Sequence, residues 1–369
     1  MENSHRHLIS SKAMLFPLVI ITTILLGAVV KIASAVILPL TFSLLLSIVA
    51  IPIVKLLVKF RIPRIVSITL VLFLFVGVLV VVGIFFYSSG QVLITTFYPK
   101  YETRIKEIYI FFEQFFGLPP YNESLSVFGN IWGQDAVRRL VNEMTISFSN
   151  GIIGVVENVL KVGFFMFFIL LQSVFFKVKL DKAFEGTVAE KINKISSSVI
   201  TQVTHYLSIK FYVSLLSGIV VATGLEIIGL EFAILWGVFQ FVFNFIPVIG
   251  SFTVGVAATA FSLIQFWPNP VPFLASGLVI LCSKTIIGTI LEPLITGDKL
   301  RLSTLLIIVF LLVWGWLWGF AGLILAVPIM ATIKIVCENI PRLEPISILM
   351  ESGVALPQKK AKEKLKRGD

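Results

Sequence analysis

Glu292 is the residue of this sequence best placed to do chemistry within an apolar stretch. It ends an apolar run and precedes Pro293, which removes a backbone donor and interrupts a helix. A carboxylate at membrane depth is costly and commonly functional, and a buried one can hold a proton and exchange it for a cation. The alternative is a charge at the inner membrane interface, capping a helix or paired with Lys299 or Arg301.

Lys284 lies eight residues before Glu292. In a helix of about 3.6 residues per turn the two side chains are roughly 80° apart, so they share a broad face without touching. Lys284 could counter the charge of an anionic substrate, or it could pair with a carboxylate on another helix. The sequence leaves both alternatives open.

Gln240 and Asn244 are uncharged polar residues four positions apart, which places them on one helical face. With carbonyl groups freed around Pro247, in the turn that ends at Gly250, they could coordinate Na⁺ or hydrogen-bond a polyol. Non-helical backbone at membrane depth is tolerated only where it is buried in protein or lines a water-filled cavity. The alternative for both side chains is a modest hydrogen bond between helices.

Two long apolar runs must position these residues. Residues 230–265 and 302–336 are each about 35 residues long, and a straight helix of that length would measure about 52 Å. A bilayer core is about 30 Å thick and needs about 20 residues, so each run is expected to break near its middle. The residues at the breaks are Asn244, Pro247, Gly250, Gly315, Gly319 and Gly322. The last three lie among Trp314, Trp316 and Trp318 and are expected to permit a tight tip or a close helix approach.

The composition is that of a polytopic helical membrane protein. Hydrophobic residues make up 57% of the chain and charged residues only 14%. The net charge of +10 could suggest nucleic acid, but the basic residues lie between spans and in the tail, as positive-inside orientation requires. Cys282 and Cys337 lie in apolar stretches and are expected to pack there. Without a phosphate-binding loop, zinc pattern or catalytic triad, the sequence predicts no metal, cofactor, ATP-driven step or enzymatic activity.

The predicted fold is an all-α membrane protein with about six full spans and two re-entrant helical hairpins. Each break forms a hairpin tip, and the two hairpins, each preceded by a span, enter from opposite sides as an inverted repeat. Eight plain spans are the alternative, because the loop charges fit both. In either topology the basic loop at 55–64 and the basic tail place both termini in the cytoplasm.

The chain divides into five predicted segments. They are 1–92, a scaffold of spans one to three; 93–149, an extracytoplasmic helical insert; 150–208, span four and a cytoplasmic amphipathic helix; 209–340, a transport unit; and 341–369, a basic cytoplasmic tail. The transport unit holds span five, the first hairpin, a further span and the second hairpin. Spans one and two are expected to form a hairpin that turns near Lys31.

Two amphipathic helices are predicted outside the spans, each able to lie on the membrane or on a neighbour. The helix in the insert has an apolar face of Ile105, Ile108, Phe112 and Phe115. The helix at 181–208 has an apolar face of Phe184, Val188, Ile192, Ile195, Val199 and Val203.

Two stretches resemble signatures of the autoinducer-2 exporter (AI-2E) family of bacterial membrane proteins. They are the turn FNFIPVIGSF at 243–252 and the run LEPLITGDKLRLSTLLIIVFLLVWGWLWGFAGLILAVPIMATIKIV at 291–336. The second run keeps Glu292-Pro293, Gly297, Leu302-Ser303, Gly315-Trp316, Gly319, Gly322 and Pro328 in the family's order. One departure is Ser251, where a proline often follows the glycine. The resemblance covers nearly the whole chain, weakly before residue 200 and strongly after residue 240.

The resemblance implies a secondary transporter of the bacterial cytoplasmic membrane that forms a homo-oligomer, such as a pentamer. Members are associated with export of autoinducer-2, a small polyol, and others resemble Na⁺(Li⁺)/H⁺ antiporters. We therefore expect an exporter of a small polar solute, coupled to ions or protons, with an antiporter as the alternative. The expected pathway residues are Gln240, Asn244, Pro247, Gly250, Lys284, Glu292 and Pro293.

Two other function classes are weighed against transport. A non-transporting membrane scaffold would need no carboxylate within the membrane, so Glu292→Gln would leave its activity unchanged. An intramembrane hydrolase would need a nucleophile and a base, and the sequence offers no such pair.

Overall fold

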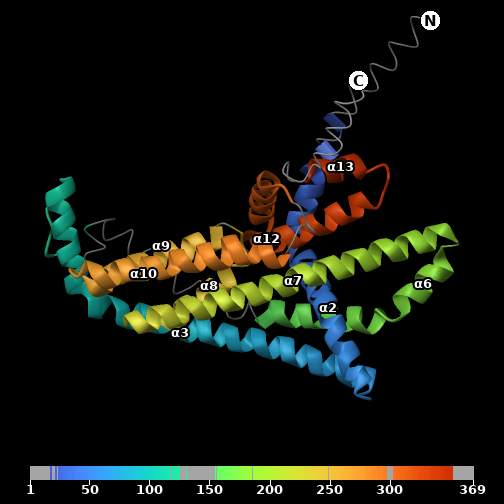
Figure 1. Cartoon of the computed structure of the whole chain (residues 1–369), viewed down its shortest axis with the longest axis horizontal. Helices are drawn as coiled ribbons and strands as arrows, with labels where there is room; N and C mark the ends of the chain where they lie inside the picture. The colour runs from blue at the N-terminus through green and yellow to red at the C-terminus, as the bar shows by residue number, and fades with distance from the viewer. Residues whose placement is uncertain are drawn as a thin grey trace, which may run out of the picture. The chain divides into compact units, whose positions relative to one another are not determined.

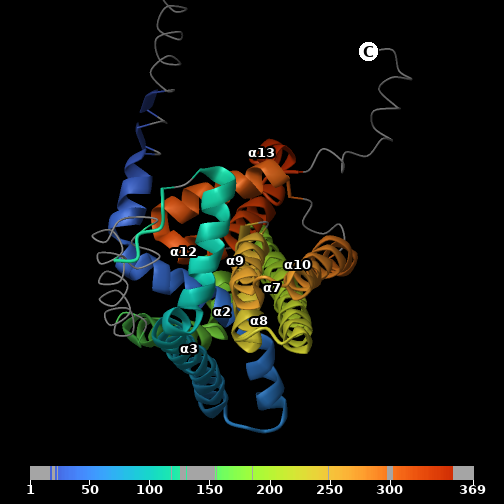
Figure 2. The same cartoon turned by 90° about the vertical axis from the view of Figure 1, so that its left-hand side faces the viewer.

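The computed structural model describes residues 17–18, 21–22, 24–117, 119–124, 130, 154, 156–184, 186–247, 249–296 and 302–351 (Figures 1 and 2). These residues are almost entirely helical. Within them six helices are long and apolar enough to cross a membrane. The six are Ser34–Lys59, Arg64–Phe85, Thr187–Ile228, Ile249–Phe266, Pro270–Ile295 and Thr304–Glu338. The predicted all-α membrane class is therefore confirmed.

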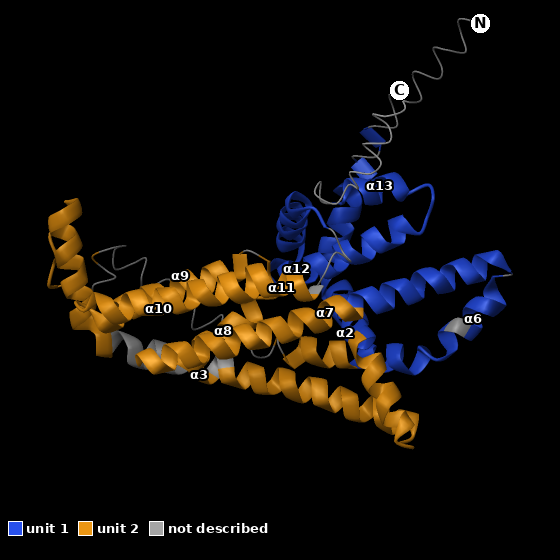
Figure 3. Ribbon diagram, viewed as in Figure 1, with its two compact units in different colours: residues 1–48, 164–203, 300–369 blue, residues 49–163, 204–299 orange. Residues whose placement is uncertain are grey.

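Contacts between residues divide the chain into two compact units (Figure 3). Unit 1 comprises residues 1–48, 164–203 and 300–369, and unit 2 comprises residues 49–163 and 204–299. The predicted transport unit at 209–340 is shared between them, with the first broken run in unit 2 and the second in unit 1.

The first helices differ from the predicted hairpin of two spans. Residues 24–32 are helical and lead directly into α2 (Ser34–Lys59). The N–H of Ala33 bonds to Val29 O at 2.8 Å, and the N–H of Ile37 bonds to Ala33 O at 3.0 Å. Because these helical bonds continue through Ala33, the described residues do not reverse near Lys31. The expected turn there is wrong: this stretch has no glycine or proline to end the helix.

Helix α3 (Arg64–Phe116) joins the third predicted span to the helix of the insert in one element of 53 residues. Gly117 ends it in the left-handed conformation, with φ at 64°. The buried residues of its last part are Tyr101, Ile105 and Tyr109, spaced by four, whereas Phe115 of the predicted face is 76% exposed. The helix is amphipathic as predicted, but tyrosines rather than phenylalanines form its buried side, because each can bury its ring and still bond through its hydroxyl.

Helix α7 (Thr187–Ile228) likewise joins the second predicted amphipathic helix to span five, over 42 residues. It follows α6 (Phe175–Ala183), from which it is separated by Phe184 in an extended conformation and by Gly186 with φ at 57°. Phe184 therefore lies before the helix and not on its face, and Val188 is exposed. Val203 of the predicted face is fully buried.

The first long apolar run is a helical hairpin within unit 2. Helices α8 (Ala233–Phe243) and α9 (Ile249–Phe266) pack against each other, and the chain turns between them at 244–247. Their contacts run in opposite directions along the two helices. Gln240 bonds to Ser251 near the turn, the rings of Trp236 and Phe261 are 5.7 Å apart further along, and Gln265 accepts the N–H of Glu231 at 2.8 Å.

A third helix runs beside this hairpin. Helix α10 (Pro270–Ser283) packs along α9, as both views show (Figures 1 and 2), and begins at Asn269, whose side chain accepts the N–H of Val271. It continues into the π-helix η1 (Lys284–Leu291) and then α11 (Glu292–Thr296).

The second long apolar run also breaks, within unit 1. Helix α12 (Thr304–Glu338) has non-helical backbone at Gly319, with φ at 60° and ψ at −140°. A Cβ on Gly322 would lie 1.9 Å from the carbonyl oxygen of Trp314, eight residues earlier, which is possible only if the chain folds back on itself. Both predicted breaks therefore produce sharp reversals of the chain.

A charged cluster ties α3 to the turn between α7 and α8, outside the candidate spans. Lys100 forms an ion pair with Glu231. Burial opposes the charge of Glu231, but hydrogen bonds from Lys100 and Tyr101 hold the pKa of Glu231 below its ordinary value. The same burial, and then the bond to Glu231, raise the pKa of Tyr101, so this phenol keeps its proton.

In unit 1, the segment that follows α12 contacts both the start and the last part of that helix. The N–H of Ser303 bonds to Met350 O at 2.9 Å, just after α13 (Glu344–Leu349), and Leu302 pairs with Glu351 in an isolated bridge. Lys334 is buried and contacts Glu338 at 3.1 Å and Glu351 at 3.5 Å. These contacts hold the start of α12 near its end.

Candidate functional site

A chain of buried polar side chains surrounds the tip of the α8–α9 hairpin, entirely within unit 2. Asn244 follows the last residue of α8, donates through Nδ2 to Ser214 Oγ at 3.0 Å and accepts from Ser251 Oγ at 2.9 Å. Each of the three residues comes from a different part of the chain: α7, the turn and α9. Since all three are at most 9% exposed, this network is buried in a region of otherwise apolar helices.

Gln240 extends the network toward α10. Its Nε2 donates to Ser217 Oγ at 3.0 Å and to Ser251 Oγ at 3.3 Å, and the hydroxyls of Ser217 and Ser283 are 3.1 Å apart. Gln240 is fully buried, and its Oε1 has no hydrogen-bond partner among the described residues. A buried acceptor without a partner is costly, so this atom is suited to a donor or cation that arrives with a substrate.

The spacing of residues on α7 explains why the network forms there. Lys210, Ser214 and Ser217 follow at intervals of four and three, which places them on one side of the helix. The helices can approach closely because Gly218 meets Gly237 of α8. A Cβ on Gly218 would lie 2.7 Å from the carbonyl oxygen of Gly237, and small residues are what permit such contact between membrane helices.

The hairpin tip depends on Gly250. A Cβ there would lie 1.7 Å from the carbonyl oxygen of Phe243, so only glycine fits. Pro247 lies in the turn, and its carbonyl oxygen accepts the N–H of Ile249 at 2.7 Å. The structure thus places Gln240, Asn244, Pro247 and Gly250 together, as the sequence predicts.

Glu292 forms an ion pair with Lys210 on α7, with Nζ and Oε1 2.6 Å apart. The Lys210 side chain is 5% exposed and the Glu292 side chain 24%. Lys299 and Arg301, the partners considered from sequence, lie outside the described residues. The π-helix ends at Leu291, directly before Glu292, and π-helical turns occur commonly at functional sites.

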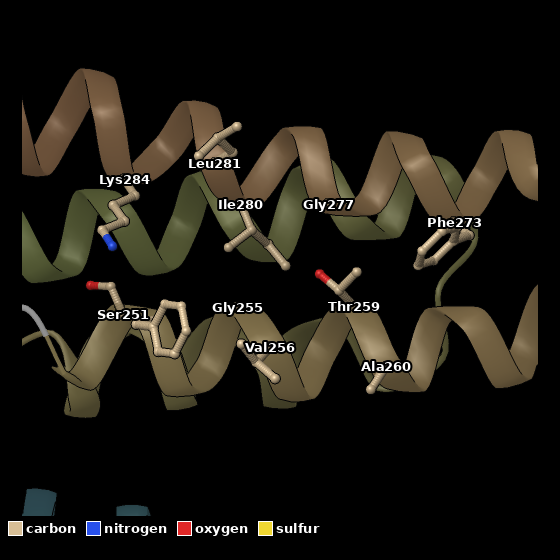
Figure 4. A pocket seen from close by; sticks show the side chains of 11 residues that line it. Ser251, Gly255, Val256, Thr259, Ala260, Phe273, Gly277, Ile280, Leu281 and Lys284 are labelled. Atoms are coloured by element: carbon tan, nitrogen blue, oxygen red, sulfur yellow. The ribbon is translucent and has the colours of Figure 1, made fainter. Parts of the chain in front are cut away.

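Lys284 lines a groove between α9 and α10 (Figure 4). Its Nζ is 5.7 Å from the centre of the Phe252 ring, and its side chain is directed toward Ser251. Lys284 and Glu292 make no contact with each other, as the helical spacing predicts. The predicted alternative of an ion pair on another helix is not seen for Lys284 within the described residues.

The three glycines of the second run lie at the reversal in α12. Gly319 carries the non-helical backbone, and a Cβ on Gly315 would meet Leu323 at 2.8 Å. The rings of Trp314 and Trp318 are 4.6 Å apart, so tryptophans pack around this tip. The indole N–H of Trp318 donates to the carbonyl oxygen of Val30 at 3.3 Å, and Lys31 lies 3.9 Å over the Trp316 ring.

The comparison with known families decides the class of this protein. A family model described as "AI-2E family transporter" matches residues 18–342. The chain belongs to the AI-2E transporter family. The expected family is confirmed, and with the six candidate spans it makes the chain a multi-pass membrane transporter.

Individual AI-2E relatives cover most of the chain. A protein of Borreliella burgdorferi named "Putative transport protein" is 32% identical over 91% of this chain and 90% of its own length. A protein of Haemophilus influenzae with the same name is 29% identical over 90% of this chain and 94% of its own. "AI-2 transport protein TqsA" of Escherichia coli is 26% identical over 87% of this chain and 91% of its own. These names favour transport over the scaffold and hydrolase alternatives.

Sequence reasoning missed several residues of the site. They are Lys210, Ser214, Ser217, Ser251 and Ser283. The signal for Lys210 was present, since a cation directly before the apolar run at 211–228 calls for a carboxylate partner. The serines could not be distinguished from other serines of the spans, because only the packing of four helices brings them together.

Proposed function

We propose that this AI-2E transporter exports a small polar solute, such as autoinducer-2, past the polar network at the tip of the α8–α9 hairpin. The observation that carries the proposal is the buried chain of hydrogen bonds from Ser214 to Ser283. It offers hydroxyl and amide groups to a polyol, and one acceptor, Gln240 Oε1, is left without a donor. Such uncharged groups suit a neutral polar solute.

The length of α8 supports a hairpin that enters the membrane and returns. Helix α8 has 11 residues, or about 16 Å, which is half of a bilayer core of about 30 Å. The turn after it would then lie near the middle of the bilayer, where transporters with broken helices bind their substrates. The reversal in α12 suggests a second re-entrant hairpin, and we propose that the two form an inverted repeat.

We further propose that the Lys210–Glu292 pair couples export to protons or cations. Glu292 keeps partial access to its surroundings whereas Lys210 is almost fully enclosed. A proton or Na⁺ that reaches Glu292 would compete with Lys210 for the carboxylate and release α7 from α11. A Na⁺(Li⁺)/H⁺ antiporter is the second candidate, favoured by this same carboxylate. The cytoplasmic membrane, cytoplasmic termini and the homo-oligomer remain part of the proposal.

Two serines of α9 give a matched test of the pathway. Ser251 takes part in the network, whereas Ser262 is buried with an Oγ that has no partner among the described residues. In vesicles loaded with autoinducer-2, Ser251→Ala should lower the export rate about tenfold, the effect of roughly 1.4 kcal/mol. Ser262→Ala should leave it unchanged. Equal effects of the two variants would remove the network from the pathway.

Coupling is tested with proteoliposomes that contain a pH dye. Addition of Na⁺ or Li⁺ should move protons in the wild type and not in Glu292→Gln. Proton movement that survives the substitution would mean that another group couples transport. Proton movement without any autoinducer-2 export would favour the antiporter.

A further inference from the structure

The groove between α9 and α10 has the shape of a small-ligand site. It encloses about 390 Å³, which lies within the usual range for such sites. Glycines let α9 and α10 approach each other along it: a Cβ on Gly255 would lie 3.1 Å from the Ile280 side chain, and a Cβ on Gly277 would lie 3.6 Å from the Thr259 side chain. Apart from Thr259 the walls are apolar for most of their length (Figure 4), so the groove suits an apolar body.

One end of the groove is polar and positively charged. Lys284 and Ser251 face each other there, from α10 and α9 (Figure 4). Lys284 is 14 residues after Pro270, the first residue of its span, or about 21 Å along the helix axis. A bilayer core of about 30 Å would therefore surround this ammonium group on both sides.

A lysine at such depth normally has a partner. The two buried lysines of the other candidate spans do: Lys210 contacts Glu292 at 2.6 Å, and Lys334 contacts Glu338 at 3.1 Å. Lys284 forms no ion pair within the described residues, and its nearest described interaction is with the Phe252 ring. A charge within the membrane is costly without a counter-charge. A bound anion would supply the counter-charge that Lys284 lacks among the described residues.

We infer that the groove between α9 and α10 binds an amphiphilic anion, with a carboxylate against Lys284 and an apolar chain along the groove. A single ammonium group matches the charge of one carboxylate. This ligand differs in class from the neutral solute proposed above, and its binding does not depend on transport. The site is therefore a second one, on the α10 side of α9.

The test is a binding measurement on the full chain in nanodiscs of zwitterionic lipid. Decanoate and decanol have the same apolar chain and differ in charge. Wild type should bind decanoate at least about tenfold more tightly than decanol, as one favourable charge contact of roughly 1.4 kcal/mol would give. Lys284→Gln should reduce that ratio to about one, and Lys284→Arg should restore it. Lys161→Gln, at an exposed lysine paired with Glu157, is the matched control and should leave the ratio unchanged.

A second variant tests the groove itself. Gly277→Leu fills the space beside Thr259 and should weaken the binding of both probes together. The inference is overturned if decanol binds as tightly as decanoate to the wild type, or if Lys284→Gln leaves the ratio intact. It is also overturned if Gly277→Leu dissociates an oligomer, because the groove would then be covered by a second copy of the chain. The two proposals are tested separately. Autoinducer-2 export by Ser251→Ala tests the proposed transport pathway, and the decanoate-to-decanol affinity ratio of the wild type tests the groove.

Discussion

The ion pair between Lys210 and Glu292 should contribute more to stability than any exposed pair of the described residues. Replacing Glu292 should cost more stability than replacing Lys210. Glu292→Gln leaves the Lys210 ammonium, only 5% exposed, without a counter-charge. Breaking a buried pair in this way costs about 3 to 5 kcal/mol. Lys210→Met leaves a carboxylate that is 24% exposed and can reach water or take up a proton, so we expect about 1 to 2 kcal/mol.

The double variant isolates the interaction. With both charges removed neither is left unpaired, so the double variant should lose less stability than Glu292→Gln alone, and the single effects should sum to more than the double effect. The measurement is the free energy of unfolding in mixed micelles, from a denaturing-detergent titration followed by tryptophan fluorescence. The exposed pair Lys161–Glu157 has the same separation of 2.6 Å and is the control, expected to give about 0.3 to 0.5 kcal/mol.

Two results would refute this reasoning. If the two single effects sum to within about 0.5 kcal/mol of the double effect, the two side chains do not interact. A larger loss for Lys210→Met than for Glu292→Gln would mean that Glu292, and not Lys210, is the enclosed partner.

Three further predictions concern the hairpins and the charged cluster. Gly250→Ala should strongly lower the thermal midpoint, since its Cβ would lie 1.7 Å from a carbonyl oxygen, whereas Gly77→Ala meets nothing within 4 Å and should be neutral or stabilising. Gly319→Ala should cost about 1 to 3 kcal/mol in an unfolding titration, because its backbone lies in a region nearly restricted to glycine. The ionised Glu231 should stabilise the folded protein above about pH 4.3. This stabilisation should be lost as the pH falls through the lowered pKa of Glu231. The protection factors of the amides at 229–232, with the intrinsic pH dependence of exchange removed, should then fall on acidification in the wild type, and Glu231→Gln should remove that dependence.

Sequence patterns determined the class, the breaks and much of the first hairpin. Run length against bilayer thickness placed both reversals correctly, because a straight helix of about 35 residues cannot fit one span. The same reasoning failed at the N-terminus and at α3 and α7. Along α3 and α7 the composition changes between apolar and polar, and each helix continues through the change, past Pro99 in α3. At the N-terminus the helical hydrogen bonds continue past Lys31.

Tertiary structure alone decided the partners. Gln240 and Asn244 were visible as polar residues on one face, and Glu292 as a carboxylate in an apolar run, but their contacts come from α7, some 23 to 82 residues away in the chain. Local spacing says which side of a helix a residue occupies; it does not say which other helix that side meets. The close contact of Gly218 with Gly237 fixes that choice here, and it is a property of two surfaces rather than of either sequence segment.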